Sequence, residues 1–177
     1  MKESDKIRLI DEKFQQQHYK TNNNCVWLSA SLLIDSRDKH ISNKMIEMLT
    51  KNPSKYEWLF LSKIPKDQKC TGSETLQHLL QSETEYELKK PTTTDTEKGF
   101  LTFILRKNTS GLYVCQLEDT SGRKTHFVGI DCDNEEIFDC EESNVLSLTK
   151  DNLDYCCGGI HNSINDIPMC HEIKKKY

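Results

Sequence analysis

The sequence predicts a single α+β domain in which a helical first half packs on an antiparallel β-sheet formed by the second half. Apolar residues between positions 22 and 90 recur at helical spacing, whereas short apolar segments separated by turn residues follow position 99. Helices that precede strands, instead of alternating with them, are typical of the α+β class. A chain of 177 residues is also long enough to bury its own core.

The expected domain covers residues 1–177 and has four parts. Residues 1–21 are polar and glutamine-rich and predict an arm or a short helix. Residues 22–90 form the helical part, residues 99–149 the antiparallel sheet, and residues 150–177 a C-terminal turn and tail.

Within the helical part, the first helix is expected from about Cys25 to Ile34, with Asn23 or Asn24 as its N-cap. It is apolar on nearly every side, which is typical of a buried helix. Later helices are expected after Ser42 and after a capping box that begins at Thr71.

Strands are expected in the second half wherever short apolar runs are bounded by turn residues. The predicted ranges are 100–105, 112–117, 124–131, 135–140 and 145–148. The first two flank Asn108–Gly111 and predict a hairpin, and the next two are joined near Asp133 and Asn134. A helical turn is expected at 151–153, ending at Gly158.

Charge and hydropathy narrow the class of protein. The chain has 24 basic and 28 acidic residues with the signs well mixed, so we expect no nucleic-acid partner. Lys174–Lys176 is interpreted as a solvated tail. The charged N-terminus lacks the apolar core of a signal peptide, and no apolar run reaches the ~18 residues of a membrane span. We therefore expect a soluble intracellular protein, cytoplasmic or nuclear, without a membrane partner.

Eight cysteines are expected to be reduced thiols in such a compartment. No Cys-x-x-Cys pair occurs, and we expect neither a metal nor a cofactor. A weaker alternative is a zinc-stabilised binding domain that uses Cys156 or Cys157, His161, Cys170 and His171.

Cys25 is the strongest candidate for catalysis. Three asparagines, residues 22–24, run directly into Cys25 and the apolar helix. At this position the unpaired backbone N–H groups and the positive end of the helix dipole favour a thiolate. The alternative interpretation is a packing role, because cysteine is among the most buried residue types. Trp27 is expected in the core or along the cleft.

His126 and Asp139 are the candidate partners of Cys25. If Asp133 and Asn134 are the central residues of a hairpin, the numbers of cross-strand partners sum to 267, and Val128 lies opposite Asp139. His126 and Asp139 then become diagonal neighbours on one face, about 7–8 Å apart and within side-chain reach. A turn shifted by one residue would place them on opposite faces.

This order of residues suits a thiol nucleophile, its base and an orienting carboxylate. Cys25 attacks a carbonyl carbon, His126 takes the thiol proton and returns it to the leaving group, and Asp139 fixes the imidazole tautomer. The Cys25 N–H is one oxyanion donor, and Gln17 and Asn22 are candidates for a second. The rival base is His161, and the rival acids are Asp131, Asp133, Glu141 and Glu142.

At these residues the chain resembles the papain-like cysteine peptidase superfamily. Asn24–Ala30 is similar to the nucleophile helix of its compact members, which include bacteriocin-processing-type peptidases, transglutaminase-like domains and deubiquitinases of the Josephin and ovarian-tumour types. His126–Asp131 and Glu136–Asp139 are similar to their His strand and Asp/Asn strand. Papain-like enzymes usually carry a glutamine shortly before the cysteine, where this chain has Tyr19 and Lys20.

The resemblance implies a papain-like fold and thiol-dependent hydrolysis of a peptide or isopeptide bond. The expected partner is a protein or peptide substrate, with ubiquitin-like proteins among the candidates. Two alternatives remain open: a transglutaminase-like acyl transferase that uses the same three residues, and a catalytically inactive papain-like interaction module.

Overall fold

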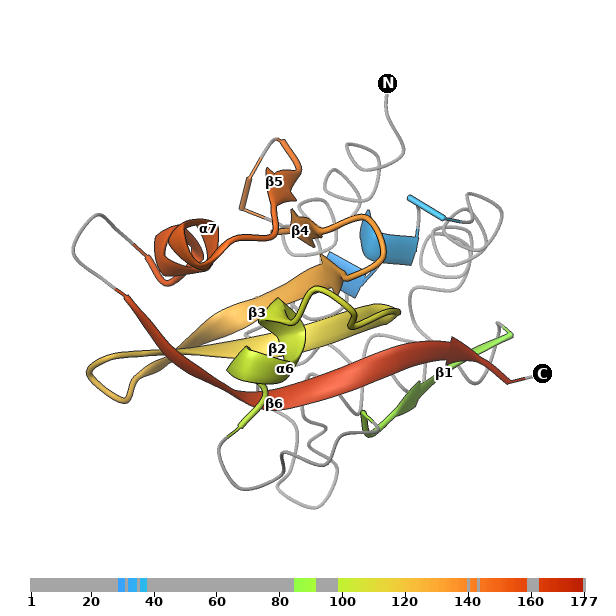
Figure 1. Ribbon diagram of the computed structural model, residues 1–177, viewed down its shortest axis with the longest axis horizontal. Helices are drawn as coiled ribbons and strands as arrows, with labels where there is room; N and C mark the ends of the chain where they lie inside the picture. The colour runs from blue at the N-terminus through green and yellow to red at the C-terminus, as the bar shows by residue number, and fades with distance from the viewer. Residues whose placement is uncertain are drawn as a thin grey trace, which may run out of the picture.

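The structure is a computed structural model that describes residues 29–30, 32–34, 36–37, 85–91, 99–139, 141–142, 144–158 and 163–176, with only the backbone of residues 124–126. An antiparallel six-stranded sheet runs through it in the order β1-β6-β2-β3-β4-β5 (Figure 1). The strands are β1 (Tyr86–Lys89), β2 (Leu112–Asp119), β3 (Lys124–Asp131), β4 (Glu136–Phe138), β5 (Leu146–Ser147) and β6 (Ile164–Lys175). The helices are α6 (Leu101–Leu105) and α7 (Lys150–Cys156), and residues 29–30 and 32–34 are also helical.

The α+β class and the antiparallel sheet are confirmed, but a helical first half is not supported. The helices expected after Ser42 and Thr71 lie outside the described residues, as does the arm at 1–21. The range 22–90, expected to be helical, ends in strand β1, which pairs with β6. The end of the first predicted helix agrees with the structure, because residues 32–34 are helical and 36–37 form a turn.

The predicted register between β3 and β4 is confirmed. Gly129 pairs with Phe138 and Ile130 with Ile137, so the partners sum to 267. The connection is wider than expected, since residues 132–135 all belong to the turn. Glu135 adopts a positive φ of 54° there. The turn is therefore centred on Asp133 and Asn134, as predicted, with one more residue on each side.

The strand predicted at 100–105 is wrong, because residues 101–105 form helix α6. A short run that is apolar throughout has no period that separates strand from helix. The tertiary environment selects the helix: Asp166 Oδ1 accepts from the Leu101 N–H at 3.4 Å, and the Phe100 N–H donates to the Ile167 carbonyl at 2.9 Å. The hairpin expected between 100–105 and 112–117 is consequently absent, and β2 pairs with β3 and β6 instead.

The C-terminal tail expected within 150–177 is also wrong. Residues 164–175 form β6, which lies between β1 and β2 in the sheet. Lys174 and Lys175 are exposed, as expected of a solvated run, but they belong to this strand. Pro168 argues against a central strand in the sequence, because proline has no ladder N–H. The register with β2 shifts beside it, where Ile167 and Pro168 together oppose Leu117, so the proline occupies a bulge.

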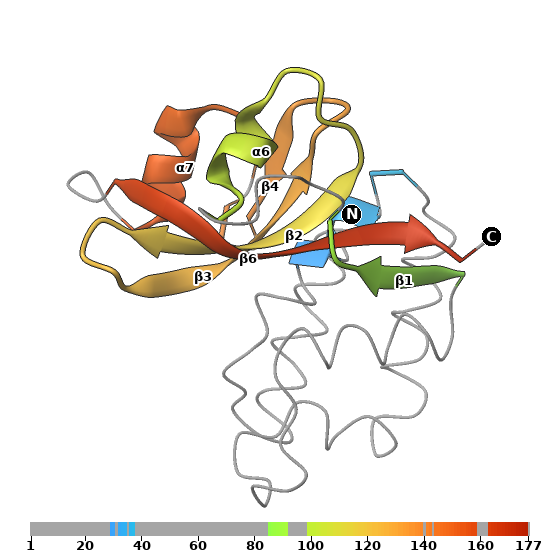
Figure 2. The same cartoon turned by 60° about the horizontal axis from the view of Figure 1, so that its bottom comes forward.

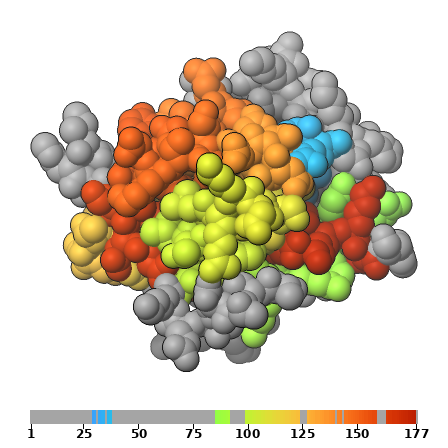
Figure 3. Space-filling view, in the orientation of Figure 1, coloured from blue at the N-terminus to red at the C-terminus, as the bar shows by residue number. Residues whose placement is uncertain are grey.

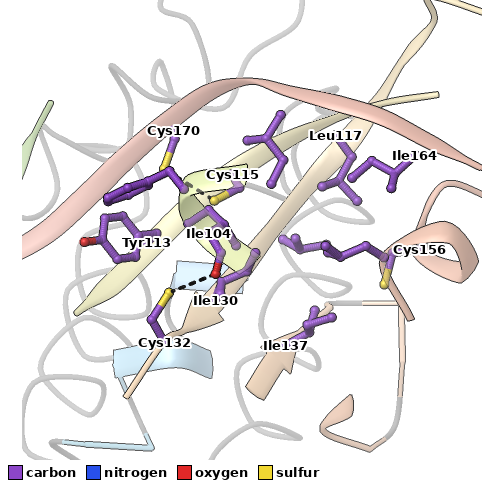
Figure 4. Close-up of a cluster of buried hydrophobic side chains, with 14 of the residues drawn as sticks. Ile104, Tyr113, Cys115, Leu117, Ile130, Cys132, Ile137, Cys156, Ile164 and Cys170 are labelled. Carbon is purple, nitrogen blue, oxygen red and sulfur yellow. Dashed lines mark hydrogen bonds between the residues drawn. The ribbon is translucent and has the colours of Figure 1, made fainter. Parts of the chain in front are cut away.

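The sheet buries side chains on both faces. One face carries the main apolar cluster, which α6 and α7 cover from the same side (Figures 2 and 4). It includes Val128, Ile130 and Ile137, which share one face through strand alternation and the β3–β4 register. Other buried residues, Leu112 and Val114 among them, point to the opposite face of the sheet and lie outside this cluster. β2 consequently shows four consecutive buried residues instead of an alternating pattern.

Among the described residues, no helix is long and apolar enough to cross a membrane.

Candidate functional site

The helical segment 29–34 packs directly on strand β3. The Ser29 hydroxyl donates to the Phe127 carbonyl at 3.3 Å. A Cβ added to Gly129 would lie only 2.9 Å from the Ser29 carbonyl oxygen and 3.2 Å from Leu33 Cβ. Glycine therefore permits a close approach of helix and strand backbones. The segment that follows the predicted nucleophile is thus placed against the strand that carries the predicted base.

An ion-pair cluster anchors the far end of this segment. Arg37 donates to Asp131 through Nε at 3.0 Å and through a terminal nitrogen at 2.7 Å, and the same nitrogen contacts Asp133 at 3.1 Å. Asp131 is 0% exposed. Burial acts to raise its pKa, but the hydrogen bonds from Arg37 and from the Asn134 backbone outweigh burial and hold the pKa below its usual value. This predicted rival acid is therefore an ionised structural partner of Arg37.

Residues from Ser29 to Arg37 contact β3 in the order in which the residues of β3 follow one another. Ser29 bonds to Phe127 and also approaches Gly129, Leu33 lies against Gly129, and Arg37 pairs with Asp131. Four residues of helix advance about 6 Å, and two residues of strand advance about 6.6 Å. The chain from Ser29 to Arg37 consequently follows β3 in the same direction.

His126 occupies an irregular position in β3. Gln116 pairs with Phe127 and Glu118 with Lys124, so Thr125 and His126 together oppose Leu117. The predicted face of His126 depends on a regular alternation of side chains along β3. This alternation is interrupted between Lys124 and His126. Only its backbone is described, and the expected approach of its ring to Asp139 lies outside the described atoms.

A second bulge lies across Leu117, at Ile167 and Pro168 of β6. Both neighbours of β2 are thus irregular at the same level of the sheet. Bulges are over-represented beside active sites, where they re-aim a side chain.

Asp139 follows β4 and is 4% exposed. Its Oδ1 accepts the Glu141 N–H at 3.0 Å, and its carboxylate also accepts the Cys156 thiol from α7. Burial, followed by the Asp139 charge and this hydrogen bond, raises the pKa of Cys156 well above its ordinary value. The carboxylate is therefore held on the α7 side of the sheet. The helical segment 29–34 contacts β3 at Gly129, on the opposite face.

The remaining predicted site residues lie outside the described part of the chain. These are Cys25, the oxyanion candidates Gln17 and Asn22, the rival base His161, and Trp27.

The described cysteines lack the surroundings of activated thiols. Cys115, Cys132, Cys156, Cys157 and Cys170 are all buried and unbridged. Burial raises the pKa of Cys132 to about 12 and that of Cys115 well above its ordinary value. Cys115 and Cys170 are cross-strand partners with their sulfurs 3.5 Å apart. A high pKa and burial make a cysteine inert, so these thiols are structural.

The described residues do not support a zinc site near the C-terminus. Within the described ranges, no group of three His, Cys, Asp or Glu side chains could hold a metal. Cys170 belongs to the main apolar cluster, and His171, the next residue of a strand, points to the other face. Burial and the Lys90 charge lower the pKa of His171, and its Nε2 is buried without a hydrogen-bond partner in the described part.

Sequence reasoning missed the contact between segment 29–34 and β3. Gly129 was the available signal, because a glycine inside a strand pattern indicates a close backbone approach or a bulge. Arg37 and Asp131 carried no comparable signal, since charged residues near a turn are expected to be solvated.

Comparison with known proteins finds no match to the chain among family models, curated proteins or solved structures.

Proposed function

We propose that the protein is a thiol-dependent hydrolase that cleaves a peptide or isopeptide bond, with Cys25 as nucleophile, His126 as base and Asp139 as orienting carboxylate. The observation that carries the proposal is the packing of segment 29–34 on β3, fixed by the Ser29–Phe127 hydrogen bond and by Gly129. In the finer fold that goes with it, the helix that begins at Cys25 lies against the antiparallel sheet as in papain-like enzymes.

Helix geometry connects this packing to the proposed pair. Cys25 precedes Ser29 by four residues, about one turn of the predicted helix. The contacts move from Asp131 through Gly129 to Phe127 as the helix is followed backwards. One further turn back leads to the level of Thr125 and His126 on the strand. The proposal therefore places Cys25 beside the bulge.

The bulge supports the role of His126. With regular alternation, the His126 side chain would point to the same face of the sheet as Val128, which belongs to the cluster beneath α6 and α7. Segment 29–34 lies on the other side, at Gly129. A strand in which two residues oppose one bends locally and re-aims its side chains, so Thr125 and His126 occupy the position where a histidine is able to turn between the two faces.

The reaction follows from these roles. The Cys25 thiolate attacks the carbonyl carbon, and the developing oxyanion accepts from the Cys25 N–H and from Asn22 or Gln17. Protonated His126 gives its proton to the amine as the C–N bond breaks, which leaves a thioester on Cys25. Water, deprotonated by His126, then attacks the thioester and releases the acid. An amine in place of this water gives the transglutaminase-like alternative.

Alkylation with iodoacetamide at pH 6 tests the thiolate. Peptide mapping by mass spectrometry compares Cys25 with the buried cysteines of the same molecule, which serve as internal controls. Cys25 is expected to react at least about ten-fold faster, because a helix N-terminus and an imidazolium lower a thiol pKa. His126→Ala should remove this difference, whereas Thr125→Ala, its neighbour at the bulge, should preserve it. Equal slow labelling in the parent, or no effect of His126→Ala, would overturn the catalytic pair.

Turnover is tested with fluorogenic amides of short peptides and of ubiquitin-like C-termini. Hydrolysis that is lost in Cys25→Ala supports the proposed activity. Product that requires an added primary amine identifies acyl transfer instead. A reactive Cys25 without turnover on any substrate, combined with saturable binding of a ubiquitin-like protein, would favour the inactive interaction module.

A further inference from the structure

A polar cavity of about 340 Å³ lies between the loop that follows α6 and the end of β6. Its walls include Phe103, Arg106, Thr109, Tyr113, Glu172 and Lys174. Residues of α6 and this loop occupy the centre of the face in Figure 3, beside β6. Tyr113 and Phe103 belong to the cluster under α6. The cavity is therefore on the opposite side of the sheet from the contact of segment 29–34 with Gly129.

Glu172 is the most unusual residue of this cavity. It is a carboxylate that is only 8% exposed. Its charged neighbour, Lys174 Nζ, lies 3.6 Å from Oε2, beyond ordinary hydrogen-bond distance. No described side chain or backbone N–H donates a hydrogen bond to it. A carboxylate buried to this degree normally has donors, because loss of hydration costs several kcal/mol per ion.

The hydroxyl oxygens of Thr109 and Tyr113 line the cavity together with Glu172. The Tyr113 hydroxyl donates to the Ser110 carbonyl at 2.7 Å, and the Thr109 hydroxyl donates to the Phe103 carbonyl at 2.6 Å. Both donors are thus used, and the lone pairs of these oxygens remain available. Gly111 has a φ of 107°, and a Cβ on it would lie 3.1 Å from Glu172 Oε1 and 3.3 Å from the Tyr113 oxygen. The inner part of the cavity therefore favours a group that donates hydrogen bonds.

Aromatic rings form one wall. Phe103 and Tyr113 contact edge to face, with centroids 5.5 Å apart. Figure 4 shows the Tyr113 hydroxyl pointing away from the buried cluster. The ring thus presents an apolar surface and one polar atom to a ligand.

Two cations restrict the ligand further. Arg106 is exposed, and the Lys174 side chain is 49% exposed, so both charges border solvent. A ligand with only a positive group would be repelled by these residues, and one with only a negative group would face Glu172. A ligand with an ammonium and a carboxylate on neighbouring atoms satisfies both charges.

We propose that this cavity binds a small zwitterion of the amino-acid type. Its ammonium donates to Glu172 and to the Tyr113 oxygen, and its carboxylate lies toward Arg106 and Lys174. The volume is at the lower end of the range for small-molecule sites, which fits an amino acid. The site is separate from the proposed thiol chemistry and does not depend on it.

Titrations followed by two-dimensional ¹H–¹⁵N NMR test the proposal with L-leucine, L-glutamate and L-lysine as probes. Saturable shifts are expected at residues 106–113 and 172–174 for at least one of them. For leucine, two matched analogues separate the charges: 3-methylbutylamine lacks the carboxylate, and 4-methylpentanoate lacks the ammonium. Each should bind at least about ten-fold more weakly than the amino acid, as expected for loss of a charge-assisted hydrogen bond. If glutamate or lysine binds best, its decarboxylated and deaminated forms replace these analogues.

Glu172→Gln should weaken binding at least about ten-fold. Glu118→Gln is the matched control, since Glu118 lies on β2 and accepts instead from Asn165. The spectrum of each free variant reports whether it folds. If Glu172→Gln does not fold, Tyr113→Phe and Arg106→Gln replace it, and both should weaken binding. The proposal is overturned if no amino acid gives saturable shifts, if the amine alone binds as tightly as the amino acid, or if the cavity variants bind like the parent.

Discussion

Gly129→Ala is the most direct perturbation of the contact between segment 29–34 and β3. The new Cβ would lie 2.9 Å from the Ser29 carbonyl oxygen and 3.2 Å from Leu33 Cβ. The first neighbour is backbone and cannot rotate away, so the helix must move off the strand. The substitution therefore acts on the packing that carries the proposed function without touching Cys25, His126 or Asp139.

Its magnitude follows from two opposing effects. Overpacking of a tight contact costs about 1–3 kcal/mol. Replacing glycine by alanine restricts the unfolded chain, which returns about 0.4–1 kcal/mol. The midpoints of these two ranges give a net loss in the free energy of unfolding of about 1.3 kcal/mol. At 2–4 °C per kcal/mol for a chain of this size, the Tm then falls by about 3–5 °C.

Urea unfolding and iodoacetamide labelling of Cys25 should be measured on the same samples. The labelling rate of Cys25 at pH 6 is expected to fall together with stability, because the displaced helix carries the thiol away from the bulge. Gly122→Ala is the control: nothing lies within 4 Å of its added Cβ, but its φ of 83° costs about 1–2 kcal/mol. It should destabilise the protein to a similar degree and leave Cys25 labelling unchanged.

A Gly129→Ala variant as stable as the parent would show that the close approach of segment 29–34 to β3 does not exist. A stability loss with unchanged Cys25 reactivity would separate the packing from the proposed site.

Three further predictions concern the described part of the structure. Asp131→Asn should lower stability at pH 7 by about 1.5–3 kcal/mol in urea unfolding, since Arg37 loses its charge-assisted hydrogen bonds to Asp131 but stays partly exposed and keeps Asp133. Because the pKa of folded Asp131 is lowered, its stabilisation is present above about pH 4 and is lost as the pH falls through the folded pKa, so the variant should show a flatter acid limb. Thr149→Ala, which removes the acceptor for the Asn152 N–H at 3.1 Å, should cost about 1 kcal/mol by the same assay. Cys132, with a pKa raised to about 12, should react with a disulfide reagent at pH 8 only as fast as the protein unfolds; rapid labelling in native buffer would contradict its burial.

Local patterns were sufficient where a segment meets its neighbour in sequence. Strand 124–131 and the β3–β4 register followed from apolar residues and from the turn at Asp133 and Asn134. The helical turn ending at Gly158 also agrees with α7, whose capping residue is Thr149. These elements are specified by turn and cap residues that act over a few positions, so their signal is local.

Local patterns failed where long-range contacts select the conformation. Residues 101–105 are apolar throughout, and their helix depends on Asp166 and Ile167 of β6. β6 itself contains Pro168 and ends in lysines, yet it pairs on both sides with distant strands. Neither the pairing nor the bulge that accommodates the proline has a signal in the nearby sequence.

The candidate site divides in the same way. The sequence by itself determined that His126 and Asp139 flank a turn and that their strands share a register, because caps, periods and turns are properties of adjacent residues. The helix that begins at Cys25 stays a prediction from the same kind of pattern. Only the tertiary structure decided that segment 29–34 lies on β3 at Gly129, that a bulge places Thr125 and His126 opposite Leu117, and that the Asp139 carboxylate accepts from Glu141 and Cys156. Those contacts join residues distant along the chain, and their energies depend on burial and close approach, which exist only after the chain has folded.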